Sequence, residues 1–138
     1  MKLNRDKILR LIAHLDEALG ELEAISHLDR AKVIATRDRF AMEQLFYRVA
    51  MICIDLCYHL ISRSSGTVPE TYRGCFAEMV TKGMIPEELG KALENLAGLR
   101  NIIAHAYIPV DYGRLYDYLN CLGQIKKFRE IVLDMARI

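Results

Sequence analysis

The chain has 138 residues, of which 52% are hydrophobic and 27% are charged, and this composition excludes an intrinsically disordered protein. Its length predicts a single domain over residues 1–138 that buries enough surface to fold without a metal or a disulfide. The net charge of +1 excludes a strongly basic nucleic-acid-binding protein, so any contact with nucleic acid has to come from a local patch.

The N-terminal stretch MKLNRDK lacks the apolar core of a signal peptide, and no run of about 18 uncharged apolar residues occurs in the sequence. We therefore expect a soluble, cytoplasmic protein without a membrane partner. Its mean hydropathy is slightly positive, which favours a partner that covers apolar surface.

The cysteines give no strong signal of a metal site or of disulfides. Cys53 and Cys57 lie one helical turn apart with His59 nearby, but the C-x-x-C spacing of zinc-binding loops is absent. We interpret the pair as core packing and expect neither a metal nor another cofactor. A disulfide framework is not expected in a cytoplasmic domain of this size.

Two long segments carry the periodicity of helices. Residues 4–25 place one apolar stripe at spacings of three and four, which predicts a helix with a single buried face. Residues 30–63 contain no Pro or Gly and are apolar on most sides, which is typical of a central helix. A break or bend within this second segment is favoured near Thr36 to Asp38, because both residue types favour helix caps.

Shorter helices are predicted in the second half of the chain. The stretch SRSSGTVPETY (62–72) predicts the longest loop, and the helix after it stops at Gly83. Pro86 lies in the first turn of the next helix, Pro109 ends it, and Asp111 caps a last helix. Because no segment alternates like a strand, the fold class is all-α: five or six helices around two long antiparallel ones.

Four polar side chains interrupt the aliphatic segment LRNIIAHAY, namely Arg100, Asn101, His105 and Tyr107. If the whole segment is helical, Arg100 and Tyr107 line one edge, and Asn101 and His105 line another. Such a site can be completed from a second subunit across a two-fold axis. A purely structural corner is the alternative, because Arg and His at a helix end bind free carbonyls and a Tyr before Pro packs turns.

The spacing Arg, four residues, His, one residue, Tyr resembles the signature of HEPN-domain ribonucleases, in particular the HepT-type toxins of toxin–antitoxin modules. The likeness extends over TVPETYRGCFAEMVTKGMIPEELGKALENLAGLRNIIAHAY and over MEQLFYRVAMICIDLCYHL, which includes Asp55. It covers most of the chain and is weaker before residue 36. The resemblance implies a helical, HEPN-like homodimer whose Arg and His line a cleft at the dimer interface.

The resemblance also implies an activity and its control. The family's toxins are metal-independent endoribonucleases, which makes Arg100 and His105 the expected catalytic residues. Their partner is a minimal nucleotidyltransferase of the MntA type, which silences the toxin by AMPylation of the tyrosine that corresponds to Tyr107.

The residue types suit cleavage of RNA, which carries its own 2′-hydroxyl nucleophile. Imidazole moves protons near neutral pH, so His105 is the expected general acid or base. The guanidinium of Arg100 can clamp phosphate oxygens. Supporting roles fall on Asn101, which would orient His105 or bind the phosphate, and on Asp55. This carboxylate would orient His105 or pair with Arg100, or else it belongs to a buried structural ion pair.

Further basic and aromatic residues are open to two readings, as an RNA-binding surface or as ordinary solvated and packed side chains. They are Arg37, Arg39, Lys126, Lys127, Arg129, Tyr112, Tyr116 and Tyr118.

A rival interpretation comes from another functional class. The chain would be a non-catalytic helical subunit that binds a nucleotide or a partner within a two-component nucleotidyltransferase. Arg100 and His105 would then hold a nucleotide phosphate without cleaving anything.

Overall fold

The fold is an all-α bundle in a computed structural model that describes residues 2–65, 68–105 and 107–137. In these ranges every regular element is a helix, which confirms the predicted fold class. The helices are α1 (Arg5–Ser26), α2 (Arg30–Ala35), α3 (Asp38–Ser65), α4 (Tyr72–Thr81), α5 (Glu87–Ala104), α6 (Tyr112–Asp117), the 3-10 helix η1 (Tyr118–Cys121) and α7 (Leu122–Ala136).

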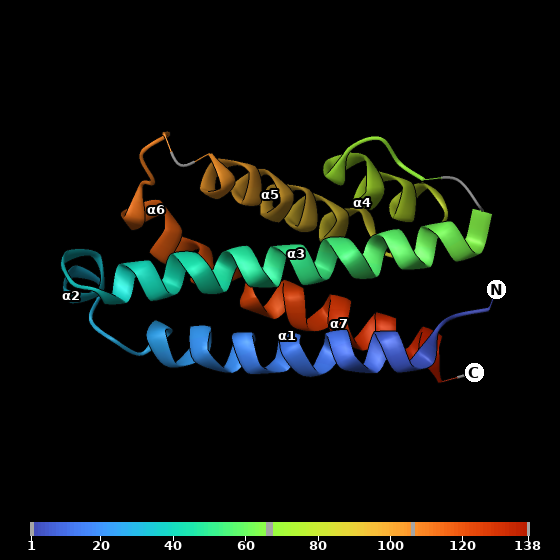
Figure 1. Cartoon of the computed structure of the whole chain (residues 1–138), viewed down its shortest axis with the longest axis horizontal. Helices are drawn as coiled ribbons and strands as arrows, with labels where there is room; N and C mark the ends of the chain where they lie inside the picture. Colours follow the sequence, from blue (N-terminus) through green and yellow to red (C-terminus); the bar gives the residue numbers. More distant parts are fainter. Residues whose placement is uncertain (1, 66–67, 106, 138) are drawn as a thin grey trace.

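Helices α1 and α3 are the two long antiparallel helices, and α3 runs through the middle of the bundle (Figure 1). Helix α1 packs against one side of α3, and α7 packs against α1. Helices α4 and α5 cover the other side of α3. Ile52 and Ile54, which are two residues apart and so point to nearly opposite sides of α3, are both buried. By length and composition α3 passes for a membrane span, but most of its apolar stretch is buried within the bundle, as in the core helix of a soluble domain.

The helix boundaries follow from capping side chains. The oxygens of Asn4, Asp29, Thr71 and Asp111 accept backbone N–H bonds at the starts of α1, α2, α4 and α6. Gly83 has φ +74°, a backbone conformation that residues with a side chain rarely adopt. It therefore ends helix α4, as predicted. The predicted break near Thr36 to Asp38 is confirmed, because α2 ends at Ala35 and α3 begins at Asp38.

Four boundaries differ from the predictions. Helix α5 ends at Ala104 and not at Pro109. Helix α3 continues to Ser65, because the hydroxyls of Ser62 and Ser64 bond to carbonyls of the preceding turn instead of competing with the helix. Pro86 is the N-cap of α5 and not part of its first turn. The predicted last helix is divided into α6, η1 and α7, which together keep one buried face.

A disulfide joins Cys57 of α3 to Cys75 of α4, so the expectation that no disulfide forms is wrong. Sequence spacing cannot show this pairing, because the packing of α4 on α3 brings the two residues together. Cys53 and Cys121 are free, and burial raises the pKa of the Cys53 thiol to about 12. Among the described residues no group of three His, Cys, Asp or Glu side chains is placed to hold a metal ion.

Reduction of the Cys57–Cys75 disulfide is expected to lower the free energy of unfolding by about 3 kcal/mol, because the bond closes a loop of 18 residues in the unfolded chain. The measurement is thermal unfolding with and without dithiothreitol. A Cys57→Ala/Cys75→Ala variant is the control and should not respond to dithiothreitol. Titration of all four thiols in unfolded, unreduced protein would contradict the prediction.

His59 gives stability a dependence on pH. Its ring is buried and its Nε2 accepts a hydrogen bond from the backbone N–H of Asn4 at 3.0 Å, which ties α3 to the start of α1. Burial, and then the charges of Arg63 and Lys7, lower the pKa of His59 from its ordinary value of 6.5. The unfolded chain therefore binds more protons than the folded one below that value.

We expect the His59 contribution to be complete above about pH 6.5 and to be lost as the pH falls toward the lowered folded pKa. When the pH is lowered from about 7.5 to about 5.5, the melting temperature of the wild type should fall further than that of a His59→Gln variant. The control is His14→Gln, which removes an exposed histidine of α1 and should keep the wild-type slope. Equal slopes in wild type and His59→Gln would contradict the prediction.

Candidate functional site

The four polar residues of the LRNIIAHAY segment lie where α5 ends. Helix α5 stops at Ala104, and His105 leaves the helix with ψ 89° while its N–H still bonds to the carbonyl of Ile102. A turn follows in which Ile108 N–H donates to the carbonyl of His105 at 2.9 Å. The face assignment made for a continuous helix is therefore wrong, because Tyr107 lies beyond the helix end.

Arg100 is held by neutral groups from three helices. Its Nε lies 3.3 Å from Sδ of Met51 on α3, and its Nη1 donates to Oδ1 of Asn101 at 3.0 Å. Its Cζ is 4.9 Å from the ring centroid of Tyr72 on α4 and 5.7 Å from that of Tyr47 on α3. Among the described residues no carboxylate pairs with this guanidinium, so its positive charge stays available to an anion.

His105 and Tyr107 form a second pair on the surface. Their ring centroids are 5.5 Å apart, and the Tyr107 hydroxyl lies 3.4 Å from Nδ1 of His105. Tyr107 is 81% exposed, and its apolar neighbours Ile102 and Ile108 are 45% and 40% exposed. The imidazole and the phenol are therefore open to solvent and to any large ligand.

The structure thus joins Arg100 with Asn101 and His105 with Tyr107. Within the described part of the chain, no hydrogen bond, ion pair or ring contact joins one pair to the other. Within one copy of the chain, the guanidinium and the imidazole lie at the same helix end as separate groups.

Asp55 takes no part in either pair. Its side chain is exposed and not buried, and no hydrogen bond or ion pair joins it to Arg100 or His105 in the described structure. Partial burial raises the pKa of its carboxyl, and the positive charge of Lys7 on α1 opposes this shift. In a single chain its nearest electrostatic partner is therefore on α1.

Sequence reasoning missed the residues that hold Arg100, namely Tyr47, Met51 and Tyr72. The sequence shows only that Tyr47 and Met51 are one turn apart in the segment of α3, and their partial burial beside Arg100 becomes visible in the structure. Tyr72 belongs to the stretch that carries the family resemblance, but only the packing of α4 shows that its ring faces the guanidinium.

The other basic and aromatic residues mostly have structural partners. Lys126 bonds to Glu23 at 3.1 Å and Arg129 bonds to Asp16, so these cations of α7 bind acidic groups of α1. Arg39 packs on the Phe40 ring, with Cζ 4.2 Å from the centroid. Three tyrosines also have partners within the fold. The Tyr112 hydroxyl donates to Glu43, and the Tyr116 hydroxyl donates to the carbonyls of Ser26 and Leu28. The Tyr118 ring makes an edge contact with Phe46.

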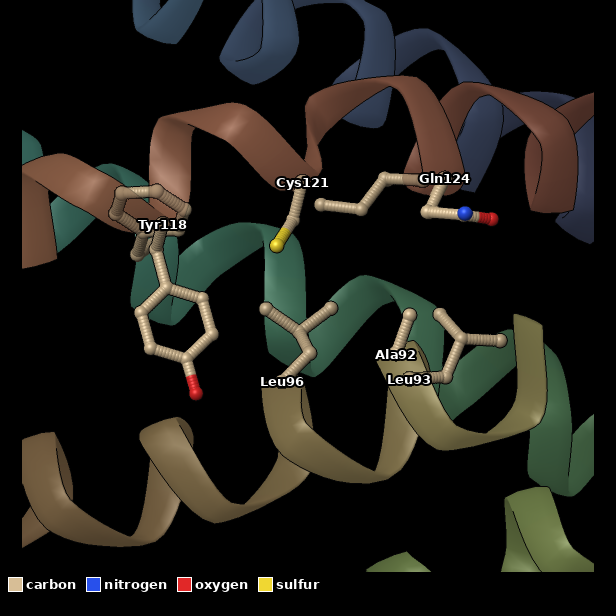
Figure 2. A pocket seen from close by; sticks show the side chains of 8 residues that line it. Ala92, Leu93, Leu96, Tyr118, Cys121 and Gln124 are labelled. Atoms are coloured by element: carbon tan, nitrogen blue, oxygen red, sulfur yellow. The ribbon is translucent and has the colours of Figure 1, made fainter. Parts of the chain in front are cut away.

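A small apolar pocket lies elsewhere, between α5 and the η1–α7 segment (Figure 2). Leu93 and Leu96 line it from one side, and Tyr118 and Cys121 line it from the other. None of the residues that line it belongs to the Arg100 or His105 pair. The polar residues at the end of α5 therefore lie outside this pocket, with His105 and Tyr107 exposed and Arg100 and Asn101 partly buried.

Comparison with protein families matches residues 15–133 to the family described as ribonuclease HepT-like. Comparison with curated proteins finds no match.

Among solved structures, a tri-AMPylated HEPN toxin of Shewanella oneidensis in complex with an MNT antitoxin is similar with a TM-score of 0.83 and 19% identity, over 92% of this chain and 96% of that one. A toxin–antitoxin structure with AMP-PNP gives 0.81 and 18% identity, over 91% and 96%. The cytosolic protein YutE of Bacillus subtilis, of unknown function, gives 0.81 and 17% identity, over 96% and 90%. These likenesses establish the fold.

Proposed function

Because the chain belongs to the HepT-like ribonuclease family, we propose that it is the toxin of a two-component toxin–antitoxin module and cleaves RNA without a metal ion. The observation that carries this proposal is the open end of α5, where an Arg100 guanidinium without a carboxylate partner lies near an exposed His105 imidazole. These are the charge and the proton-transfer group that RNA cleavage requires.

In this mechanism the substrate supplies the nucleophile. His105 takes the proton from the 2′-hydroxyl or gives one to the leaving 5′-oxygen, and Arg100 binds the phosphate oxygens as negative charge develops on them. Asn101 holds the guanidinium through its Oδ1, so its supporting role is to orient Arg100. Met51 and the ring of Tyr72 restrict the same side chain, which lowers the entropy that phosphate binding costs.

The active site is proposed to form between two copies of the chain. Within one copy, Arg100 and His105 do not contact each other, and each has a free side. A two-fold axis near the end of α5 would bring the imidazole of one copy toward the guanidinium of the other. The exposed side chain of Ile108, beyond the end of α5, supports this arrangement, because it offers apolar surface for such an interface.

Tyr107 is proposed as the site at which a nucleotidyltransferase of the MntA type transfers AMP and silences the nuclease. Its hydroxyl is accessible, since the side chain is 81% exposed, and it lies 3.4 Å from Nδ1 of His105. A phosphate attached there would be next to the imidazole and would attract the Arg100 guanidinium. The adduct would thus exclude RNA by its volume and by its charge.

The first test is RNA cleavage by the purified chain in the presence of EDTA. His105→Ala should lower the cleavage rate by at least about 100-fold, because general acid–base catalysis contributes at least that much. His27→Ala, which removes another exposed histidine, should keep the wild-type rate. Intact RNA in the presence of a chain that still binds its nucleotidyltransferase would contradict the proposal and would favour the non-catalytic subunit.

The second test is the site of modification. Incubation with the nucleotidyltransferase and ATP should add AMP to the peptide that contains Tyr107 and should stop cleavage. Tyr107→Phe lacks the attacking hydroxyl, so it should remain unmodified on this peptide and stay active under the same conditions. Mass spectrometry and the cleavage assay read the two effects, and a Tyr107→Phe protein that is still fully silenced would contradict the assignment.

A further inference from the structure

We propose that Arg73 of α4 is a second phosphate-binding residue, which holds an RNA backbone phosphate beside the one held by Arg100. The inference rests on the proposed function, because it takes RNA as the ligand, and it adds a contact from a helix outside the LRNIIAHAY segment. Its starting point is the unusual closeness of the Arg73 side chain to the backbone of α5.

The guanidinium of Arg73 lies over Gly98, inside α5. A Cβ atom at residue 98 would overlap with Nη2 of Arg73 and would lie 3.0 Å from its Cζ. Only a residue without a side chain lets the guanidinium approach the helix this closely. Glycine within a helix costs about 0.5–1 kcal/mol relative to alanine. The close approach of the Arg73 guanidinium is a reason for a glycine at this position.

Arg73 of α4 lies against α5 at Gly98, two residues before Arg100 in the sequence. Tyr72 and Arg73 are consecutive at the start of α4, and the ring of Tyr72 packs on Arg100 while Arg73 covers Gly98. Asn101, which accepts a hydrogen bond from Arg100, comes three residues after Gly98 and is therefore its neighbour on the surface of α5.

The same face of α5 leads to the imidazole. Gly98, Ile102 and His105 follow one another at spacings of four and three, so the Arg73 guanidinium lies two turns before His105 on that face. Ile102 between them is exposed, and no described element covers it. An extended strand can therefore pass from Arg73 to His105 along the surface of α5.

No acidic partner neutralises Arg73. Its side chain is exposed, and within the described residues it belongs to no salt bridge. Lys126 and Arg129 on α7, by contrast, are each paired with an acidic residue of α1. The positive charge of Arg73 is therefore available to a phosphate of the RNA backbone.

The experiment measures binding of a labelled, single-stranded oligouridylate by fluorescence anisotropy, with His105→Ala as the parent protein so that the probe stays intact. Arg73→Ala removes the cation, and Gly98→Ala displaces it while every charge remains in the chain. Both should weaken binding about fivefold and lower the slope of log affinity against log salt by roughly 0.7, the value for one phosphate contact on a single strand.

Two matched variants serve as controls. Gly20→Ala adds a methyl group to an exposed helical glycine with open space around it, and Arg10→Ala removes an exposed cation of α1. Both should bind as the parent does. Gly98→Ala should also melt at or above the parent temperature, since alanine favours the helix and the displaced group is the end of a flexible side chain. Weaker binding with unchanged folding is a result that a purely structural role of residue 98 would not give.

The outcomes separate this inference from the proposed function. Parent-like binding by both Arg73→Ala and Gly98→Ala overturns the role of Arg73 and leaves the nuclease proposal standing. A parent that does not bind the oligouridylate, together with a wild type that does not cleave RNA, overturns both. If the affinity falls together with a change in the mass of the assembly by light scattering, Arg73 contacts a second copy or a protein partner, and the phosphate-binding role is wrong.

Discussion

The contacts of the Arg100 guanidinium join three helices, and the geometry of the candidate site depends on them. Met51 of α3, Tyr72 of α4 and Asn101 of α5 approach the same side chain through sulfur, an aromatic face and an amide oxygen. All of these groups are neutral, so they fix the position of the cation without cancelling its charge. A carboxylate in the same place would hold the arginine as firmly and would compete with a phosphate.

The position of α4 places one of these contacts, the ring of Tyr72. Cys75 lies one turn after Tyr72, and its disulfide to Cys57 fixes α4 against the central helix α3. The edge contact between Tyr58 and Tyr72 adds a second tie, with ring centroids 6.0 Å apart. Tyr72 and Arg73 lie in the first turn of α4, so the rotation of this helix about its own axis decides whether they face α5. The disulfide therefore contributes to the geometry of the candidate site as well as to stability.

Most of the fold follows from local signals in the sequence. The stripe of α1 and the two apolar faces of α3 define the core, and Asn4, Asp29 and Asp111 cap helices as their residue types predict. The candidate site is less predictable, because its pairs depend on where α5 ends and on what packs beside it. Arg100, Asn101, His105 and Tyr107 do gather at one helix end, but the pairs differ from those of a continuous helix. Neither the disulfide nor the contact of Arg73 with Gly98 leaves a local signal, since both arise from the packing of α4.

The end of α5 also places the residue of the proposed modification beside the residue of the proposed proton transfer. Because the chain leaves the helix at His105, Tyr107 turns back and places its ring beside the imidazole. Had the helix continued, the two side chains would lie about 200° apart around it and would face different surroundings. With the observed turn, a group attached to the Tyr107 hydroxyl lies within a few ångströms of the proposed proton-transfer atom and on the open side of the site. The exposure that would admit an RNA strand to His105 in the proposed nuclease would therefore also admit the proposed modifying enzyme to Tyr107.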